Sequence, residues 1–360
     1  MVFIAVYFFL ILVFILGLIR LPLTKIDPTL PQQKFSIIIP FRNEEQNIEA
    51  LLKSIQNLRY HSENFEILLI DDHSTDGSTN KIKEWLVKLP NLKILNNCRV
   101  TNAPKKDAIQ VGLKHALFDF IITTDADCIL PKNWLHSYNT VLKKEKSLFV
   151  AGPISLNAED NFVQQYQKYD NLSLIGATMG SFGIKRPMMC NAANMGFDKK
   201  KYLEMSENHK SIASGDDIFT LEYFTKNYPK KVHFLNSDGA MVKTKAEKTW
   251  KNTLQQRIRW AAKTPYYKSV LTKVVGLIVL STQLAILLNL LHQPSHSLVL
   301  WIIKMAIDFL LILIVAKKTN QTTSYLQYLR VAIIYPLLNS YIGIKSLFGG
   351  YTWKGREFRR

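Results

Sequence analysis

Long apolar runs near the two ends of the chain restrict this sequence more than any other feature. Val2 to Ile19 contains no charged residue, and a helix needs about 20 consecutive apolar residues to cross a bilayer. Val274 to Leu291 and Leu298 to Ala316 are comparable runs. The residues between the first and second runs have the mixed composition of a soluble enzyme. The sequence therefore predicts a membrane protein with one globular domain between its membrane segments.

Basic residues beside these runs predict their orientation. Arg20 follows the first run, Lys317 and Lys318 follow the third, and the connection from His292 to Ser297 contains no Lys or Arg. Because cytoplasmic loops carry an excess of Lys and Arg, the N-terminus and this connection are expected outside. The first run lacks the flanks of a cleaved signal peptide, so residues 1–20 are expected to remain as an anchor. We therefore predict a multi-pass protein of the cell membrane whose globular domain is cytoplasmic.

A fourth apolar stretch, Val331 to Ile344, differs from the other three. It is shorter, contains Pro336, and is flanked by Arg330 and Lys345. Positive charge at both ends favours a re-entrant or interfacial helix over 325–348, following two transmembrane helices over 270–316. Residues 349–360 would then form a basic cytoplasmic tail.

The formal net charge of +18 raises the question of an acidic partner. Lys and Arg concentrate beside the apolar runs and in Lys243 to Lys273, so anionic lipid headgroups are the simplest partner. No nucleic-acid-binding motif accompanies the charge, and no nucleic-acid partner is predicted. The three cysteines, Cys98, Cys128 and Cys190, have no paired spacing, which indicates reduced thiols in place of a disulfide framework or a zinc site.

The middle of the chain alternates short apolar runs with amphipathic stretches. Phe35 to Ile39 and Ile67 to Ile70 are typical of strands, and apolar residues between Ile48 and Ile55 recur at helical spacing. Four further elements follow: a helix from about Ser78 with Ile82, Trp85 and Leu86 on one face, a strand near Leu92 to Leu95, a helix across Ala108 to Ala116, and a strand Phe118 to Thr123. This order predicts an α/β fold with an open, mostly parallel twisted sheet covered by helices. In such sheets ligands bind beyond the carboxyl ends of the strands.

Polar turns follow three of the predicted strands. The first carries Pro40-Phe41-Arg42-Asn43-Glu44-Glu45, in which Asn43 can cap the next helix. Asp71-Asp72 follows the second strand and could be a capped turn. Because two adjacent acids repel each other, which a plain helix cap does not require, we favour a ligand-binding role for this turn. Asp125 and Asp127 follow the last strand at i and i+2, a pair that suits a hard divalent cation with phosphate oxygens as its other ligands.

Two further motifs lie in the second half of the chain. Asp216 and Asp217 follow Ser214-Gly215 and precede an apolar helix, where they act either as helix-dipole acids or as a general base for an acceptor hydroxyl. Gln256, Arg259 and Trp260 fall at i, i+3 and i+4 and share one helix face. That face suits a diphosphate and a sugar or base ring; the alternative is an interfacial helix with snorkelling arginines and a tryptophan at the membrane boundary.

In this order the motifs resemble the family 2 glycosyltransferases, over roughly Phe35 to Lys263. The apolar runs resemble those of the membrane-bound branch that contains cellulose, hyaluronan and ceramide glycosyltransferases. The resemblance implies a GT-A fold over 34–265, with a nucleotide-binding half at about 34–130 and an acceptor half at about 131–265. It also implies a nucleotide-sugar donor, most commonly UDP-linked, Mg²⁺ or Mn²⁺, and inversion at the anomeric carbon.

The resemblance implies roles for individual residues. The nucleotide sugar would be contacted by Pro40, Arg42, Glu44, Asp71, Asp72, Lys105 and Asp125. Asp125 and Asp127 would hold the metal, and Asp217 would be the base, with Asp216 as the alternative. The acceptor and diphosphate end would be lined by Asn194, Gln256, Arg259 and Trp260. Two positions depart from the family pattern: Pro104 stands where the family usually has a glycine before the lysine, and Gly-Asp-Asp replaces the Thr-Glu-Asp of many polymer synthases.

The choice of acceptor rests on the small number of membrane segments. Three spans and one partial segment offer little wall for a polysaccharide channel, so we favour transfer of one sugar to a membrane lipid, such as a sphingolipid-like, carotenoid or polyprenyl acceptor. A processive polysaccharide synthase, which would have a glycan acceptor, is the first alternative. A non-catalytic nucleotide-binding membrane scaffold is the second. Lys304 and Asp308, at i and i+4 in the third run, form either a structural ion pair or a functional site.

Overall fold

The structure is a computed structural model that describes residues 2–159, 161–205, 215–353 and 356–358. The chain divides into two compact units, each assembled from separated segments. The sheet unit comprises Leu23–Ser155 and Met189–Lys245, and the helix unit comprises Met1–Pro22, Leu156–Met188 and Ala246–Arg360. The predicted domain over 34–265 is therefore not one unit, because two segments inside it pack with the apolar helices.

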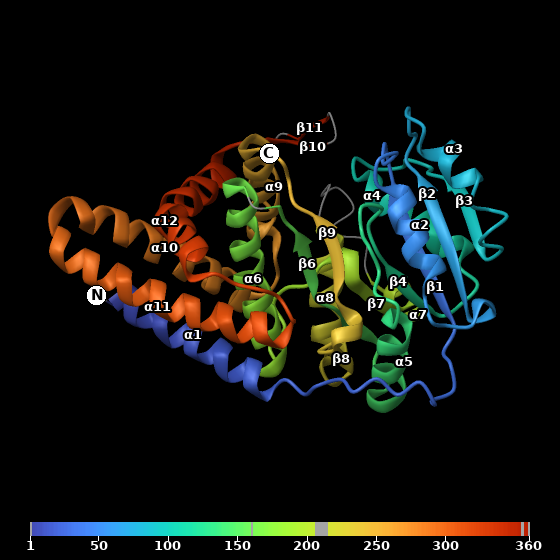
Figure 1. The fold of residues 1–360 in the computed structure, drawn as a ribbon, viewed down its shortest axis with the longest axis horizontal. Coiled ribbons are helices and arrows are strands. Elements are labelled where there is room, and N and C mark those ends of the chain that lie inside the picture. Colours follow the sequence, from blue (N-terminus) through green and yellow to red (C-terminus); the bar gives the residue numbers. More distant parts are fainter. Residues whose placement is uncertain (1, 160, 206–214, 354–355, 359–360) are drawn as a thin grey trace. The chain divides into compact units, whose positions relative to one another are not determined.

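The sheet unit is built on a seven-stranded sheet with the order β3-β2-β1-β4-β7-β5-β8 (Figure 1). Its strands are β1 (Phe35–Phe41), β2 (Phe65–Asp71), β3 (Leu92–Asn96), β4 (Phe120–Thr123), β5 (Phe149–Ala151), β7 (Met195–Asp198) and β8 (Val232–Phe234). β1 pairs in parallel with β2 and β4, β2 pairs in parallel with β3, and β7 is antiparallel to β4 and β5. The predicted strands and their mostly parallel order are confirmed, except that β4 begins at Phe120 and not at the predicted Phe118. The carboxyl ends of β1 to β4 share one edge.

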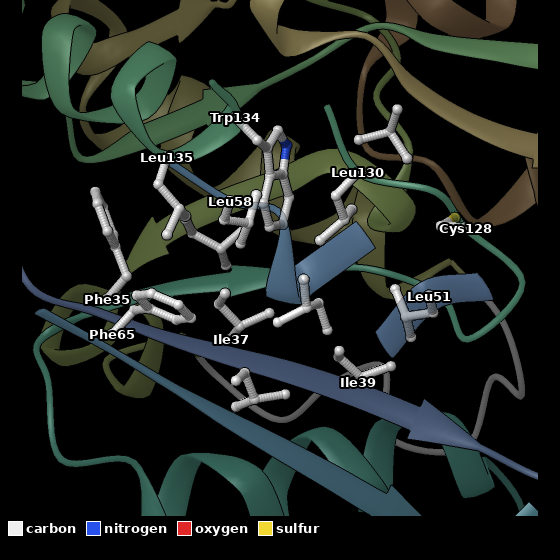
Figure 2. Packing of buried hydrophobic residues seen from close by; sticks show 14 of the residues in the cluster. Phe35, Ile37, Ile39, Leu51, Leu58, Phe65, Cys128, Leu130, Trp134 and Leu135 are labelled. Carbon is white, nitrogen blue, oxygen red and sulfur yellow. The ribbon is translucent and has the colours of Figure 1, made fainter. Parts of the chain in front are cut away.

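Helices cover both faces of this sheet, which is why β1 and β2 are apolar over nearly their whole length. Phe35, Ile37 and Ile39 of β1 point to the same face, where they pack with Leu51 and Trp134 (Figure 2). On the opposite face Gly112 lets a helix approach the sheet closely, since a Cβ there would lie 2.6 Å from Ile38.

The helices of the sheet unit differ from the sequence expectations in detail. They are α2 (Ile48–Gln56), α3 (Ser78–Lys83), α4 (Pro104–His115), α5 (Trp134–Glu145), α7 (Lys199–Leu203) and α8 (Asp216–Asn227). Pro104 occupies the first helical position of α4, where its missing N–H costs nothing, so α4 starts before the predicted Ala108. Because α3 ends at Lys83, Leu86 does not share the buried face of Ile82 and Trp85 but is 39% exposed.

The helix unit contains the apolar segments. Its helices are α1 (Val2–Arg20), α6 (Phe162–Gly183), α9 (Trp250–Ala261), α10 (Val270–His292), α11 (Pro294–Lys318) and α12 (Tyr325–Phe348). Among the described residues, four helices are long and apolar enough to cross a membrane: Phe3–Arg20, Val270–His292, Pro294–Lys318 and Tyr325–Phe348. α12 continues without a break through Pro336. The segment predicted as re-entrant or interfacial is thus a fourth candidate span by length and composition.

Two short pairs of strands complete the fold. β6 (Ile154–Asn157) pairs with β9 (Val242–Lys245), and β10 (Tyr351–Trp353) forms an antiparallel hairpin with β11 (Arg356–Phe358). Part of the predicted basic tail therefore forms a hairpin. The tail positions 354, 355, 359 and 360 lie outside the described residues.

α6 was not predicted from the sequence, and three glycines explain its position. It packs against α1, α11 and α12. A Cβ added at Gly17 would lie 2.0 Å from the Gly180 carbonyl oxygen. A Cβ added at Gly183 would lie 1.9 Å from the Gly17 carbonyl oxygen. The two backbones therefore meet directly, a contact that only glycine permits and that apolar helices use to associate.

Gly180→Ala is expected to destabilise the protein by about 3 kcal/mol or more, because the new methyl group would lie 2.6 Å from the Phe14 carbonyl oxygen. The measurement is the thermal midpoint of the purified protein in detergent. Gly276→Ala in α10 is the matched control, since its nearest neighbour would be 3.9 Å away and alanine favours a helix. Equal midpoints for the two variants would contradict the close α1–α6 packing.

Candidate active site

The turns after β1 and β2 are locked together at the carboxyl edge of the sheet. Asn43, with a left-handed φ of 53°, accepts a hydrogen bond from the Thr75 backbone N–H at 2.8 Å. The Glu45 backbone N–H donates to Asp76 Oδ2 at 3.1 Å. Asn43 was predicted to cap the next helix, but α2 begins only at Ile48. Its side chain bridges two turns instead, which holds the Pro40 to Glu45 segment beside the β2 turn.

Asp71 and Asp72 occupy different environments. Asp72 is 7% exposed, and its Oδ1 accepts hydrogen bonds from Asn97 at 2.8 Å and from Arg99 Nε at 2.6 Å. Arg42 and Arg99 both donate to the Asp72 carbonyl oxygen, at 2.9 and 2.8 Å. Asp71 is half-buried, so it is the member of the pair that keeps exposure for a ligand. Asp72 and Arg42 instead form a clamp that shapes the turn.

Arg99 is a residue that the sequence analysis missed. It lies shortly after β3, at the same carboxyl edge as the other site residues. Its ion pair with Asp72 offsets the repulsion expected between the two adjacent acids. The signal is present in the sequence, because Arg99 follows the strand predicted near Leu92 to Leu95 just as the acidic turns follow the other three.

Asp125 and Asp127 follow β4 as predicted, and both are half-buried. Asp125 Oδ1 lies 2.5 Å from the Lys105 ammonium, and Asp127 Oδ2 accepts a hydrogen bond from Thr244 at 2.9 Å. Burial, with Asp125 and Glu44 as further causes, raises the pKa of Asp127 to about 6. The pair is therefore a place where negative charge is costly in the metal-free protein.

Lys105 connects the Asp125 pair with the acids of α8. Burial by itself lowers the pKa of Lys105, but the charges of Asp125, Asp216 and Asp217 together raise it above its ordinary value. Lys106, the next residue of α4, places its ammonium 5.2 Å from the ring centroid of Phe219 in α8. The N-terminal turns of α4 and α8 and the turn after β4 thus bring Lys105, Asp125, Asp216 and Asp217 to one site within the sheet unit.

The two acids of α8 differ in accessibility. Gly215 adopts φ 100°, which only glycine reaches without strain, and it turns the chain into α8. Asp216 is 9% exposed, whereas Asp217 is half-buried and its Oδ1 accepts from the Ile218 backbone N–H at 2.8 Å. Asp217 is therefore the better placed of the two to meet a substrate hydroxyl. Ser214, the first residue of this motif, lies outside the described residues.

Asn194 is held inside the sheet unit. It is fully buried, and its Oδ1 accepts from Trp134 Nε1 at 2.9 Å and from the Tyr138 hydroxyl at 3.0 Å. Its Nδ2 donates to the carbonyl oxygens of Pro153 and Ala240, both at 2.8 Å. An amide with two donors and two acceptor positions is fully used by these bonds. This geometry fits a structural role in place of the predicted acceptor contact.

Gln256, Arg259 and Trp260 lie on α9 and so belong to the helix unit. All three are half-buried, whereas Arg257 and Ile258 between them are buried at 6% and 2% exposure. The strongly held charge of this motif is Arg257, which the sequence analysis did not single out.

The carboxylates fit a divalent cation that takes other ligands from its substrate. Within the part of the chain that the structure describes, no group of three or more His, Cys, Asp or Glu residues is placed to hold a metal. Mg²⁺ commonly uses one or two carboxylates and completes its shell with waters and substrate phosphates. The raised pKa of Asp127 shows that its negative charge is unfavourable where it is buried beside Asp125, and a bound cation would offset that cost.

Metal affinity is expected to depend on pH through Asp127. A metal binds the ionised carboxylate, and the pKa of this group is about 6 in the metal-free protein. Affinity for Mn²⁺ should therefore rise about tenfold per unit as pH increases towards 6 and level off above about 7. Titrations of Mn²⁺ binding at a series of pH values measure this, and Asp127→Asn should remove the dependence. A flat profile in the wild type would contradict the assignment of Asp127 as a ligand.

Three comparisons with known proteins bear on this site. Residues 36–204 match the Glycosyl transferase family 2. A curated relative from Methanococcus voltae, named dolichyl N-acetyl-alpha-D-glucosaminyl phosphate 3-beta-D-2,3-diacetamido-2,3-dideoxy-beta-D-glucuronosyltransferase, is 31% identical over 180 residues. That match covers 48% of this chain and 54% of the relative, so the chain spans about half the length of the curated relative it matches.

Solved structures are similar in fold. The mannosyltransferase PcManGT from Pyrobaculum calidifontis, in complex with GDP-Man and Mn²⁺, superposes with a TM-score of 0.56 at 15% identity, covering 96% of this chain and 95% of that one. For S. aureus TarS 1-349 in complex with UDP the match covers 91% of this chain and 96% of that one, at 16% identity and a TM-score of 0.43. The family match and the fold agree with the motifs at the sheet edge. Residues 36–204 therefore match the family 2 glycosyltransferases, and the chain has the fold of the GT-A enzymes together with apolar helices at both ends.

Proposed function

We propose that this protein transfers one sugar from a nucleotide sugar to a hydroxyl group of a membrane lipid, with inversion at the anomeric carbon. The observation that carries the proposal is the convergence of Lys105, Asp125, Asp216 and Asp217. Lys105 pairs with Asp125 at 2.5 Å, and although burial lowers the pKa of Lys105, the charges of the three carboxylates raise it. This arrangement provides separate groups for the donor diphosphate and for the acceptor. A helix cap alone would need only one acidic residue.

In the proposed reaction Asp217 accepts the proton of the acceptor hydroxyl while that oxygen bonds to the anomeric carbon. The bond between the anomeric carbon and the diphosphate oxygen breaks, and its electron pair leaves with the nucleoside diphosphate. Attack from the face opposite the leaving group inverts the anomeric centre. Lys105, now paired with Asp125 at 2.5 Å, would turn to the phosphate oxygens once donor is bound.

We assign Asp125 and Asp127 to a divalent cation, Mg²⁺ or Mn²⁺, which would supply positive charge to the leaving diphosphate. The Mn²⁺ held with GDP-Man in the PcManGT complex supports this choice. Pro40, Glu44 and Asp71 are assigned to the nucleoside, which we expect to be the uridine of a UDP-sugar. Gln256, Arg259 and Trp260 remain proposed contacts of the diphosphate and acceptor, on the strength of the motif resemblance.

A lipid acceptor is supported by two independent features. Four described helices are long and apolar enough to cross a membrane, and the curated relative is named for a dolichyl-linked acceptor. We place the protein in the cell membrane with its catalytic domain in the cytoplasm. The positive-inside rule puts Arg20, Lys317 and Lys318 on the cytoplasmic side, and the catalytic domain follows Arg20 directly in the chain.

The test is release of nucleoside diphosphate by detergent-purified protein from a panel of UDP- and GDP-sugars. Each donor is supplied with native membrane lipid extract and Mg²⁺, Mn²⁺ or EDTA. We expect metal-dependent turnover of one donor together with a sugar-labelled lipid. A labelled polymer would support a processive synthase instead. Nucleotide binding without turnover of any donor would support a non-catalytic scaffold.

A further inference from the structure

A single buried guanidinium contacts two of the three motif residues on α9. Arg257 is 6% exposed, and its Nη1 donates a hydrogen bond to Gln256 Oε1. Its Cζ lies 4.4 Å from the ring centroid of Trp260, a cation–π distance. The side chain that lies between the motif residues in sequence is therefore also their common neighbour in space.

Two helices outside the motif hold this guanidinium in place. Arg257 Nε donates to Asp170 Oδ2 in α6 at 2.6 Å, and both side chains are 6% exposed. The other carboxylate oxygen of Asp170 accepts from the Tyr335 hydroxyl in α12 at 3.0 Å. Arg257 is thus fixed from behind by a carboxylate that is itself fixed by a tyrosine.

Stability does not explain this arrangement well. Burying two charges costs solvation free energy, and replacement of a buried ion pair by apolar residues of similar size is often neutral or stabilising. The pair instead fixes the orientation of the guanidinium. Its planar fork sets the direction of the hydrogen bonds that it donates and the orientation of an aromatic ring that stacks on it. A role in orienting the neighbouring side chains accounts for its position.

The contact decides which way the Gln256 amide faces. Arginine has five N–H donors and no acceptor, so the amide atom next to Arg257 must be the oxygen. The NH₂ group of Gln256 then points away from Arg257, on a side chain that is half-buried. Gln256 is therefore presented as a donor, which suits a phosphate or hydroxyl oxygen. The Trp260 ring is held by the same guanidinium and is also half-buried.

We propose that Arg257, Asp170 and Tyr335 are positioning residues that orient Gln256 as a hydrogen-bond donor and fix the plane of the Trp260 ring. The part of this inference that concerns catalysis rests on the proposed function, in which Gln256 and Trp260 contact substrate. The part that concerns orientation does not. The two parts can be tested separately.

The conservative variant Arg257→Lys separates positioning from charge. Lysine can still pair with Asp170, but it lacks the fork for Gln256 and the plane for Trp260. We expect kcat to fall about 10- to 100-fold, as for a small misplacement of a substrate contact. The affinity for Mn²⁺ should not change, because its proposed ligands Asp125 and Asp127 belong to the sheet unit. A merely structural charge would be rescued by lysine. Wild-type kcat in Arg257→Lys would therefore overturn the catalytic part.

The double variant Asp170→Leu/Arg257→Met removes the pair without leaving a buried unpaired charge. It should fold, with an unchanged or higher thermal midpoint, and lose kcat to the same extent as Arg257→Lys. Glu49→Leu/Lys53→Met is the control, because it removes an ion pair, 2.6 Å long, whose two members both lie on α2 and outside the proposed site. Equal kcat in the two double variants would contradict the proposal.

If either double variant fails to fold, two single Tyr→Phe variants on α12 provide a second test. Tyr335→Phe removes the hydrogen bond to Asp170, whereas Tyr328→Phe removes one to the Met305 carbonyl oxygen at 2.7 Å. We expect lower kcat in Tyr335→Phe alone. Equal activity of the two would count against the proposal.

Hydroxyl-radical footprinting read by mass spectrometry tests orientation without any turnover. Oxidation of Trp260 should increase in Arg257→Lys, because the guanidinium no longer covers the ring. Trp134, fully buried in the sheet unit, serves as the internal control. Unchanged oxidation of Trp260 would overturn the orientation part. If the wild type is inactive but oxidation of Trp260 still increases in Arg257→Lys, only the proposed function is contradicted.

Discussion

Asp217→Asn is expected to lower kcat by about 10²- to 10⁴-fold, the usual contribution of a general base. Asparagine keeps the shape of the side chain but cannot accept the proton of the acceptor hydroxyl. The residue lies on the first turn of α8, half-buried, and acts electrostatically on Lys105 together with Asp125. Affinity for nucleotide and metal should not change, because none of the groups proposed to contact them lies on α8. Single-turnover transfer at saturating donor measures the chemical step directly.

Two further variants of the same helix make this prediction specific. Glu222→Gln, also on α8, changes the charge equally but lies outside the site, so its kcat should match the wild type. Asp216→Asn should lose less activity than Asp217→Asn, since Asp216 is only 9% exposed. If Asp216→Asn instead showed the larger loss, the roles of the two acids would be exchanged. Wild-type activity in both would remove the base from α8.

Asp127→Asn is expected to weaken Mn²⁺ binding at least about 100-fold at pH 7.5, and metal-dependent nucleotide binding with it. The substitution removes one of two carboxylates proposed for the cation, while an asparagine oxygen can still accept from Thr244 at the present 2.9 Å distance. It should also stabilise the metal-free fold slightly, since it removes a charge whose burial, followed by repulsion from Asp125 and Glu44, raises the pKa of Asp127. Isothermal titration with Mn²⁺ and UDP gives the affinities, and a thermal scan gives the stability.

Asp238→Asn is the matched control for this substitution. It makes the same change at an exposed acid of the sheet unit that has no place in the proposed site. Mn²⁺ affinity should equal that of the wild type. Should Asp127→Asn bind Mn²⁺ as tightly as this control, the metal would have to be bound elsewhere or not at all.

The strands and the acidic turns of the sheet were predictable from sequence because their signal is local. β1 and β2 are apolar over nearly their whole length, as strands covered on both faces must be. Parallel pairing then sends the residues after each strand to one edge, so Asp71, Asp125 and Asp127 could be assigned to one site before any contact was known.

The elements that were missed depend on contacts between distant segments. α6 mixes glutamines with apolar residues, and the segment becomes interpretable only where Gly180 and Gly183 meet the backbone of α1. Asn43 has the composition of a helix cap, but it serves a neighbouring turn through Thr75. Asn194 lies in a polar loop of the kind that contacts ligands, yet four hydrogen bonds use its amide inside the core.

By itself the sequence determined the α/β alternation, the apolar helices at both ends, and the acidic residues that follow the strands. Each of these follows from periodicity, length or position along a single element, and so needs no partner to be recognised. The tertiary structure decided which charges are exposed to a ligand and which are held inside. Asp72 is held inside by its ion pair with Arg99, whereas Asp71 is half-buried. Arg257 is held inside by its ion pair with Asp170, whereas Arg259 is half-buried. The physical reason is that the free energy of a charged group depends on its neighbours and its burial, and both are set by residues far away in the chain.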